Sequence, residues 1–101
     1  MTAPEYAAWR REKTPHFLLD VRQPEEYAAA RIEGALLIPL NELPGRAAEL
    51  PKDVPVVVMC HHGMRSAHAV HHLREAGFDA VNLSGGIDAW SREVDSLVPL
   101  Y

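Results

Sequence analysis

Two patterns of apolar and polar positions alternate along the chain. Four short apolar runs predict β-strands at residues 17–21, 36–38, 55–59 and 80–83. The run at 55–59 is rich in β-branched residues and almost unbroken, which is typical of a strand buried on both faces. Segments with helical spacing lie between the runs. This alternation predicts an α/β fold: a central, mostly parallel sheet of four to five strands with helices on both faces.

The clearest helix is predicted over residues 66–76. Its apolar residues recur at helical spacing, and Gly77 stands directly after its end. A second helix is predicted after Thr2, which can cap a helix start, and a short third one from Pro24.

Glycine and proline mark the remaining breaks. Pro44-Gly45 is expected to interrupt the helical turns between residues 41 and 50. Gly85-Gly86 is expected to make a tight turn into a short helix over residues 87–92. The last residues, from Val94 on, are expected to be irregular.

Composition narrows the class of protein. The 101 residues predict a single domain, 1–101, and 48% hydrophobic with 24% charged residues is the composition of an ordinary globular protein. A net charge of −4 argues against nucleic acid as a partner. No apolar run approaches the ~20 residues that span a bilayer, so a membrane is not expected either. One cysteine and no signal-peptide pattern together predict a cytoplasmic protein.

Cys60, the only cysteine, directly follows the buried strand. Open α/β folds place their chemistry at this end of the strands. The loop after Cys60 opens a helix, so unpaired backbone N–H groups and the helix dipole face one point there. Gly63 lets the backbone and a ligand approach closely. A cysteine in this position is expected to be stabilised as the reactive thiolate, with Arg65 adding positive charge, in a pocket that suits a small anion.

Four segments carry a family resemblance: Leu18–Tyr27, Arg31–Pro39, Cys60–Ser66 and Val81–Trp90. In this order and with these gaps they resemble the motifs of the rhodanese-like sulfurtransferases, specifically the small single-domain type. The resemblance covers nearly the whole chain and implies the three-layer rhodanese-like fold.

The resemblance also implies a two-step mechanism. Cys60 would take a sulfane sulfur from thiosulfate or a persulfide donor, form a persulfide, and pass the sulfur to a thiophilic acceptor. No metal ion and no organic cofactor are implied. The implied partners are a small anionic sulfur donor and a sulfur-carrier or acceptor protein. The rest of the active-site loop would bind the substrate: His61, His62, Gly63, Met64, Arg65 and Ser66.

Loop length separates sulfur transfer from related chemistry. Cys60 and Arg65 enclose four residues. The related phosphatases and arsenate reductases have one residue more, which makes room for a tetrahedral oxyanion, so the shorter loop favours sulfur. Two alternatives stay open. One is a non-catalytic sulfur-relay or redox-sensing module that uses the same pocket, and the other is a small phosphatase or arsenate reductase.

The chain departs from the family pattern in two places. Ala30-Arg31 stands where the family often has Gly-His, which puts local packing rather than catalysis in question. The family often begins with a short edge strand, whereas only Met1 precedes Thr2 here. Four strands and at most a remnant of a fifth are therefore expected.

The other polar residues near the loop have mainly structural interpretations. Arg65 is expected to pair with a carboxylate such as Glu26 and hold the loop, with a substrate contact left open. Asp20 and Arg22 follow the first strand and are expected to serve loop architecture.

The histidines are interpreted with more alternatives. His61 and His62 either contact substrate directly or only tune the local charge. His68 and His72 lie four residues apart on the predicted helix, a spacing that can bind zinc. Because no third ligand is evident, no metal site is expected.

Overall fold

Four parallel strands form the centre of the computed structural model, which describes residues 1–101. The strands are β1 (Phe17–Asp20), β2 (Leu36–Leu37), β3 (Val56–Met59) and β4 (Ala80–Asn82), in the order β2-β1-β3-β4. All neighbouring pairs are parallel. The predicted α/β architecture and the four predicted strands are confirmed, each strand being slightly shorter than its apolar run.

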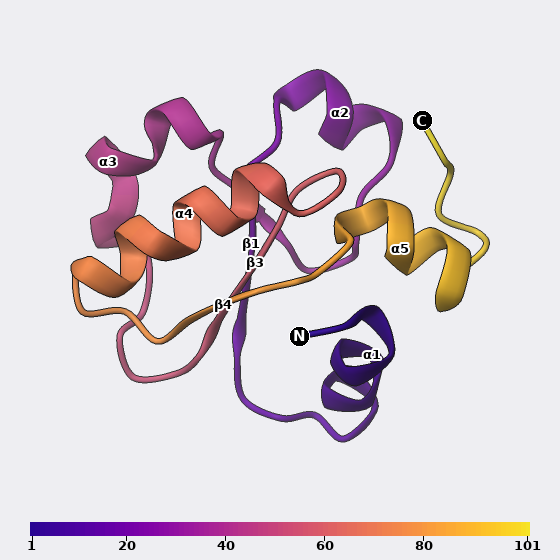
Figure 1. Ribbon diagram of the computed structural model, residues 1–101, viewed down its shortest axis with the longest axis horizontal. Coiled ribbons are helices and arrows are strands. Elements are labelled where there is room, and N and C mark those ends of the chain that lie inside the picture. Colours follow the sequence, from indigo (N-terminus) through magenta and orange to yellow (C-terminus); the bar gives the residue numbers. More distant parts are fainter.

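Helices cover both faces of this sheet (Figure 1). One face carries α3 (Leu43–Arg46) and α4 (Met64–Glu75), and the other carries α1 (Ala3–Arg11) and α5 (Gly86–Glu93). Helix α2 (Pro24–Ala29) follows β1, and two 3₁₀ turns, η1 (Leu40–Glu42) and η2 (Ala47–Glu49), flank α3. None of these helices is long and apolar enough to cross a membrane.

The core consists of two layers that meet at β3. Val56 and Val58 belong to the layer under α3 and α4, whereas Val57 and Met59 belong to the layer under α1 and α5. All four side chains are fully buried. Alternate side chains of a strand point to opposite faces, so β3 confirms the prediction of a strand buried on both sides.

The N-terminus lies against the free edge of β4. The ammonium group of Met1 donates to the carbonyl oxygen of Asn82 at 3.0 Å, and the Ser84 N–H donates to the Met1 carbonyl at 2.7 Å. This pairing is the remnant of a fifth strand that the sequence leads us to expect. Thr2 then caps α1 as predicted, and its side chain and that of Glu5 each accept the other's backbone N–H.

Two boundary predictions are wrong. The helix predicted from Ser66 begins two residues earlier, at Met64, because Gly63 takes a φ of 108° and turns the chain directly into the helix. Pro44-Gly45 lies inside α3 instead of interrupting it. Proline is tolerated in a first helical turn, where its missing N–H has no partner to lose.

Candidate active site

Cys60 lies at the carboxyl end of β3, directly before the loop that opens α4. Its Sγ accepts hydrogen bonds from the Gly63 N–H at 3.0 Å and from the Ser66 hydroxyl at 3.3 Å. The residue is only 1% exposed. The structure therefore places the predicted cradle of donors around this sulfur atom.

Two opposing effects act on the protonation of this thiol. Burial raises the pKa of Cys60, because a charged thiolate loses hydration. Hydrogen bonds from the Ser66 hydroxyl and from the backbone N–H groups of Ser66, Gly63 and Arg65 lower the pKa, and together they prevail. The thiolate, which is the nucleophilic form, is favoured relative to an ordinary cysteine.

The N-terminus of α5 holds the start of the loop through backbone hydrogen bonds. The N–H of Ile87 donates to the carbonyl of Cys60 at 2.9 Å, and the N–H of Asp88 donates to the carbonyl of His61 at 3.1 Å. Gly86 makes this approach possible, because a Cβ there would overlap both carbonyl groups. The sequence predicts only a tight turn at Gly85-Gly86; the structure adds a direct role in fixing the active loop.

Asn82 is a site residue that the sequence analysis missed. Its Nδ2 donates to the carbonyl of Gly63 at 3.1 Å, and its Oδ1 accepts from the Ser66 hydroxyl at 2.5 Å. That hydroxyl has one proton and two acceptors, Asn82 Oδ1 and Cys60 Sγ. The available signal was a polar residue at the end of the predicted strand at 80–83, inside one of the family-like segments.

Arg65 forms the predicted ion pair with Glu26. Its two terminal nitrogens bind the two carboxylate oxygens at 2.6 and 2.8 Å. The hydrogen bonds from Arg65 lower the pKa of Glu26 to about 2, despite partial burial. The pairing ties the far end of the loop to α2, and a substrate contact by Arg65 stays a prediction.

Asp20 and Arg22 form a fully buried ion pair at the carboxyl end of β1, with Nη2 and Oδ2 2.7 Å apart. Arg22 also donates to the carbonyls of Ala30 and Glu26 at 2.7 and 3.2 Å. Every polar atom of this buried group therefore has a partner. The predicted role in loop architecture is confirmed.

Tyr101, at the far end of the chain, is the second residue that the sequence analysis missed. Its hydroxyl donates to Glu26 Oε2 at 2.8 Å and accepts from Arg22 Nη1 at 2.9 Å. Its ring stacks on His61, with centroids 4.0 Å apart and planes 9° apart. Nothing in the local pattern of the last residues indicates these contacts, because their partners lie 75 and 79 positions away.

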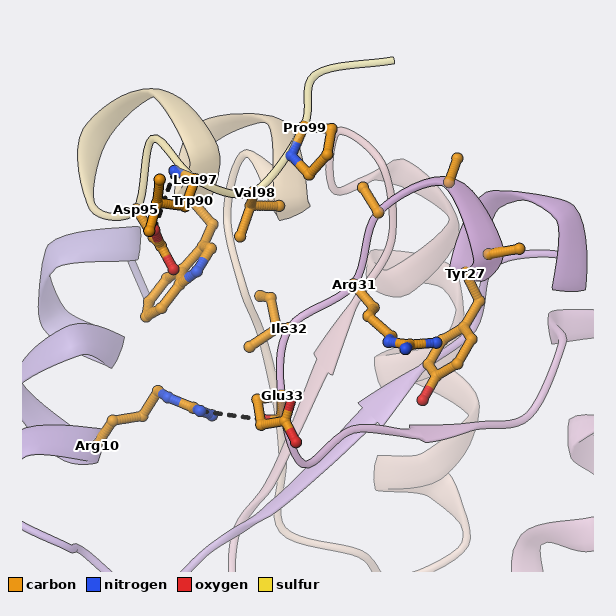
Figure 2. A pocket seen from close by; sticks show the side chains of 13 residues that line it. Arg10, Tyr27, Arg31, Ile32, Glu33, Trp90, Asp95, Leu97, Val98 and Pro99 are labelled. Carbon is orange, nitrogen blue, oxygen red and sulfur yellow. Dashed lines mark hydrogen bonds between the residues drawn. The ribbon is translucent and has the colours of Figure 1, made fainter.

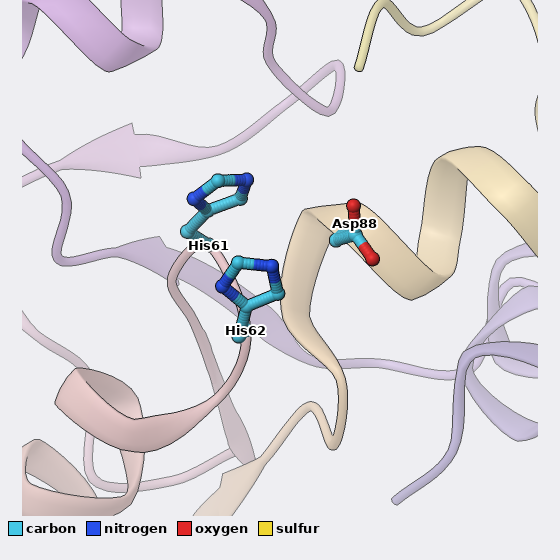
Figure 3. A group of neighbouring side chains, drawn as sticks. All are labelled: His61, His62 and Asp88. Atoms are coloured by element: carbon cyan, nitrogen blue, oxygen red, sulfur yellow. The ribbon is translucent and has the colours of Figure 1, made fainter. Parts of the chain in front are cut away.

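His61, His62 and Asp88 form the cluster in Figure 3, with potential ligand atoms within 4.8 Å of one another. The two imidazole rings stack at 3.9 Å. Burial lowers the pKa of His61, and the neighbouring His62 lowers it further. The backbone hydrogen bond from Asp88 to His61 brings the Asp88 side chain near the two imidazole rings. Arg92 pairs with the Asp88 carboxylate at 3.0 Å. The absence of a metal site stays a prediction.

Met64, His68 and His72 lie outside this network. Met64 is the first residue of α4, and its side chain is 84% exposed. His68 and His72 have ring centroids 5.0 Å apart on α4 and line a cavity of about 420 Å³ between α3 and α4. Met64 is therefore available to contact a partner at the loop, whereas the α4 histidines face a different part of the molecule.

The sequence predicts a pocket for a small anion at Cys60, and the two cavities of the structure lie elsewhere. A larger cavity of about 470 Å³ lies between the segment 27–33 and the segment 95–99 (Figure 2). Neither cavity is lined by a residue of the loop 60–66. The loop donors point at Sγ, and Cys60 is 1% exposed in this conformation.

The chain belongs to the rhodanese-like domain family, whose family model matches residues 2–93. Solved structures agree: a rhodanese-like domain protein from Staphylococcus aureus superimposes with a TM-score of 0.87 at 34% identity, covering 100% of this chain and 96% of that one. A rhodanese-related protein from Thermoplasma volcanium gives a TM-score of 0.85 at 34% identity, with coverages of 100% and 97%. The predicted family and fold are confirmed.

Relatives by sequence carry sulfurtransferase names. A protein of Allochromatium vinosum named "Sulfurtransferase" is 45% identical over 76 residues, which is 74% of this chain and 71% of that protein. "Probable adenylyltransferase/sulfurtransferase MoeZ" of Mycobacterium tuberculosis is 43% identical over 88 residues, 83% of this chain but only 22% of that protein. The chain thus corresponds to about a fifth of the longer relative. The family and these names support sulfur transfer as the general class of activity.

Proposed function

We propose that the protein is a sulfurtransferase that carries sulfur as a persulfide on Cys60. In the first step the thiolate attacks the outer sulfur of thiosulfate, a new S–S bond forms, and the donor's S–S bond breaks with its electron pair leaving on sulfite. In the second step an acceptor nucleophile attacks the terminal sulfur of the persulfide, and the electron pair of that bond returns to Cys60. The cycle is covalent and needs no metal or organic cofactor.

The hydrogen bonding of Cys60 Sγ is the observation that carries this proposal. Donors from Gly63 and Ser66 surround the sulfur and lower its pKa against the effect of burial. A sulfur anion is the species that such donors stabilise, both as the attacking thiolate and as the leaving thiolate of the second step. A persulfide anion next to the same N–H groups is stabilised by the same hydrogen-bond donors.

The closeness of these donors to Sγ favours sulfur over phosphate or arsenate. A phosphoryl or arsenyl group held on the sulfur would need loop N–H groups that point at its oxygens, whereas thiosulfate leaves only one sulfur atom on Sγ and the rest departs as sulfite. Here the Gly63 N–H is 3.0 Å from Sγ itself, so this donor is directed at the sulfur atom. The four-residue spacing from Cys60 to Arg65 supports the same choice.

The physiological donor is expected to be a small anion such as thiosulfate, or a protein persulfide. The positive end of the α4 dipole, with the loop N–H groups, would orient such a donor toward Sγ. A sulfur-carrier or acceptor protein would then meet the loop, where Met64 offers an exposed apolar contact. A reducing compartment such as the cytoplasm suits a free, reactive thiol.

A sulfur-relay module is the second candidate. Two relatives named as combined adenylyltransferases and sulfurtransferases favour it. The chain matches only about a fifth of the length of each, so the matching segment is one part of a longer protein. In such a role Cys60 would accept and deliver sulfur between proteins with little turnover of free thiosulfate.

A cyanide assay tests the proposal. Thiocyanate formation is followed with thiosulfate, mercaptopyruvate or a protein persulfide as donor, and Cys60→Ser serves as the control. We expect turnover with ping-pong kinetics for the wild type and none for the variant. Persulfide transfer from a protein donor without thiosulfate turnover would favour the relay module. Release of phosphate from an aryl phosphate, or no transfer with any donor, would contradict the sulfurtransferase.

A further inference from the structure

Tyr101 connects the two ends of the active loop. Its ring stacks on His61, the first residue after Cys60, at a centroid distance of 4.0 Å. Its hydroxyl donates to Glu26 at 2.8 Å, the carboxylate that holds Arg65 at the other end of the loop. The same hydroxyl accepts from the buried Arg22 at 2.9 Å. One side chain thus fastens the last segment of the chain across the loop.

Access to Cys60 from solvent is limited in this conformation. Cys60 is 1% exposed, and neither cavity of the protein reaches the loop. A nucleophilic attack requires the donor sulfur to come into van der Waals contact with Sγ along the line of the bond that breaks. Because Cys60 is 1% exposed, we expect a group near the loop to move before a donor contacts Sγ.

Two apolar side chains of the segment 95–101 are exposed to solvent. Leu97 is 90% exposed and Leu100 is 53% exposed, so neither side chain anchors the segment. Its main internal anchor is Val98, which is buried and whose carbonyl accepts from the Ser91 hydroxyl. Much of the segment borders the cavity of about 470 Å³ seen in Figure 2 instead of packing against a filled core. Few packing contacts oppose its displacement.

We propose that Tyr101 is a gate that controls access to Cys60. In the closed state its ring and hydroxyl hold the loop shut. Displacement of the segment 95–101 opens the path for a donor or acceptor, while Arg65 stays paired with Glu26. The gate keeps the thiolate and the persulfide from water and oxidants between the two transfers. The inference concerns access to the same site and rests on the proposed role of Cys60.

Alkylation of Cys60 by iodoacetamide, a small neutral probe, tests the gate. The rate constant is measured across pH for the wild type, Tyr101→Ala and Tyr101→Phe, with Leu97→Ala as a control on the same segment. The plateau at high pH reports access to a fully formed thiolate, and the midpoint reports its pKa, so the two effects are separated. Cys60 is the only cysteine, so every alkylation event reports on this site.

We expect the plateau rate to rise about tenfold or more in Tyr101→Ala, which loses the stack and both hydrogen bonds. Tyr101→Phe keeps the ring and should rise by a smaller factor, about two- to fivefold. Leu97→Ala should match the wild type. Thermal unfolding confirms that each variant is folded, and Tyr101→Phe keeps the test valid if Tyr101→Ala is not.

Equal plateau rates in all four proteins would overturn the gate, and so would a rise in Leu97→Ala as large as that in Tyr101→Ala. The alkylation readout needs no sulfur transfer. If the cyanide assay fails but Tyr101→Ala is alkylated faster than the wild type, the proposed function is rejected and the gate is retained. If the wild type turns over but alkylation is the same in Tyr101→Ala, the gate is rejected and the proposed function is retained.

Discussion

Ser66→Ala tests whether the hydroxyl at the start of α4 activates Cys60. Ser66 is fully buried, and its hydroxyl lies 3.3 Å from Sγ. A hydrogen bond to a charged group contributes about 1.5–3 kcal/mol, but this proton is shared with Asn82 Oδ1 at 2.5 Å. About half of that value is expected to act on the thiolate. Because 1.36 kcal/mol corresponds to one pKa unit, the pKa of Cys60 should rise by about half a unit to one unit.

The pH dependence of the alkylation rate measures this change directly. Asn82→Ala is the matched control, because it removes the competing acceptor and leaves the Ser66 hydroxyl free to donate to Sγ. We expect this variant not to raise the pKa of Cys60, although it loses the brace on Gly63 and some stability. An unchanged pKa in Ser66→Ala, or an equal rise in both variants, would refute the hydroxyl's role and point to loop geometry alone.

Two further substitutions test how the loop is held. The pKa of Glu26 is about 2 instead of 4.5, so its pairing with Arg65 stabilises the fold above about pH 4.5 and is lost as the pH falls toward 2. With side chains 20% and 37% exposed, solvent screening leaves about 1–2 kcal/mol, so Glu26→Gln should lose this amount in urea unfolding at neutral pH. If Glu26→Gln lost the same unfolding free energy at pH 2, the loss could not be assigned to the ion pair. Gly86→Ala places a Cβ on the carbonyls of Cys60 and His61, so thiocyanate formation should fall at least tenfold. Wild-type kinetics in this variant would show that the contact is not needed, and Gly45→Ala, where a Cβ meets nothing within 4 Å, is the control.

The central part of the fold could be predicted from the sequence, because strands and helix caps depend mainly on residues that are close together in the chain. The apolar run that becomes β3, the cap at Thr2 and the position of Cys60 at a strand end are all readable in the sequence. The ion pair of Arg65 with Glu26 was predictable from charge and the expected position of the loop.

The parts that were missed are contacts between segments far apart in the chain. Asn82 reads as a strand residue, and only the pairing of β4 with β3 brings its amide to Gly63. Tyr101 lies in an irregular segment whose placement depends on packing against α2 and the loop. The enclosure of Cys60 is likewise a property of tertiary packing, since the sequence pattern describes donors around a sulfur atom but not the surface above it.

Intact mass spectrometry after incubation with a sulfur donor tests the role of Cys60 most directly. The protein is mixed with thiosulfate or a protein persulfide, freed of excess donor, and weighed before and after addition of cyanide. We predict a gain of one sulfur atom that disappears with cyanide and that Cys60→Ser does not show. No gain with any donor, or the same gain in Cys60→Ser, would contradict a persulfide carried on Cys60.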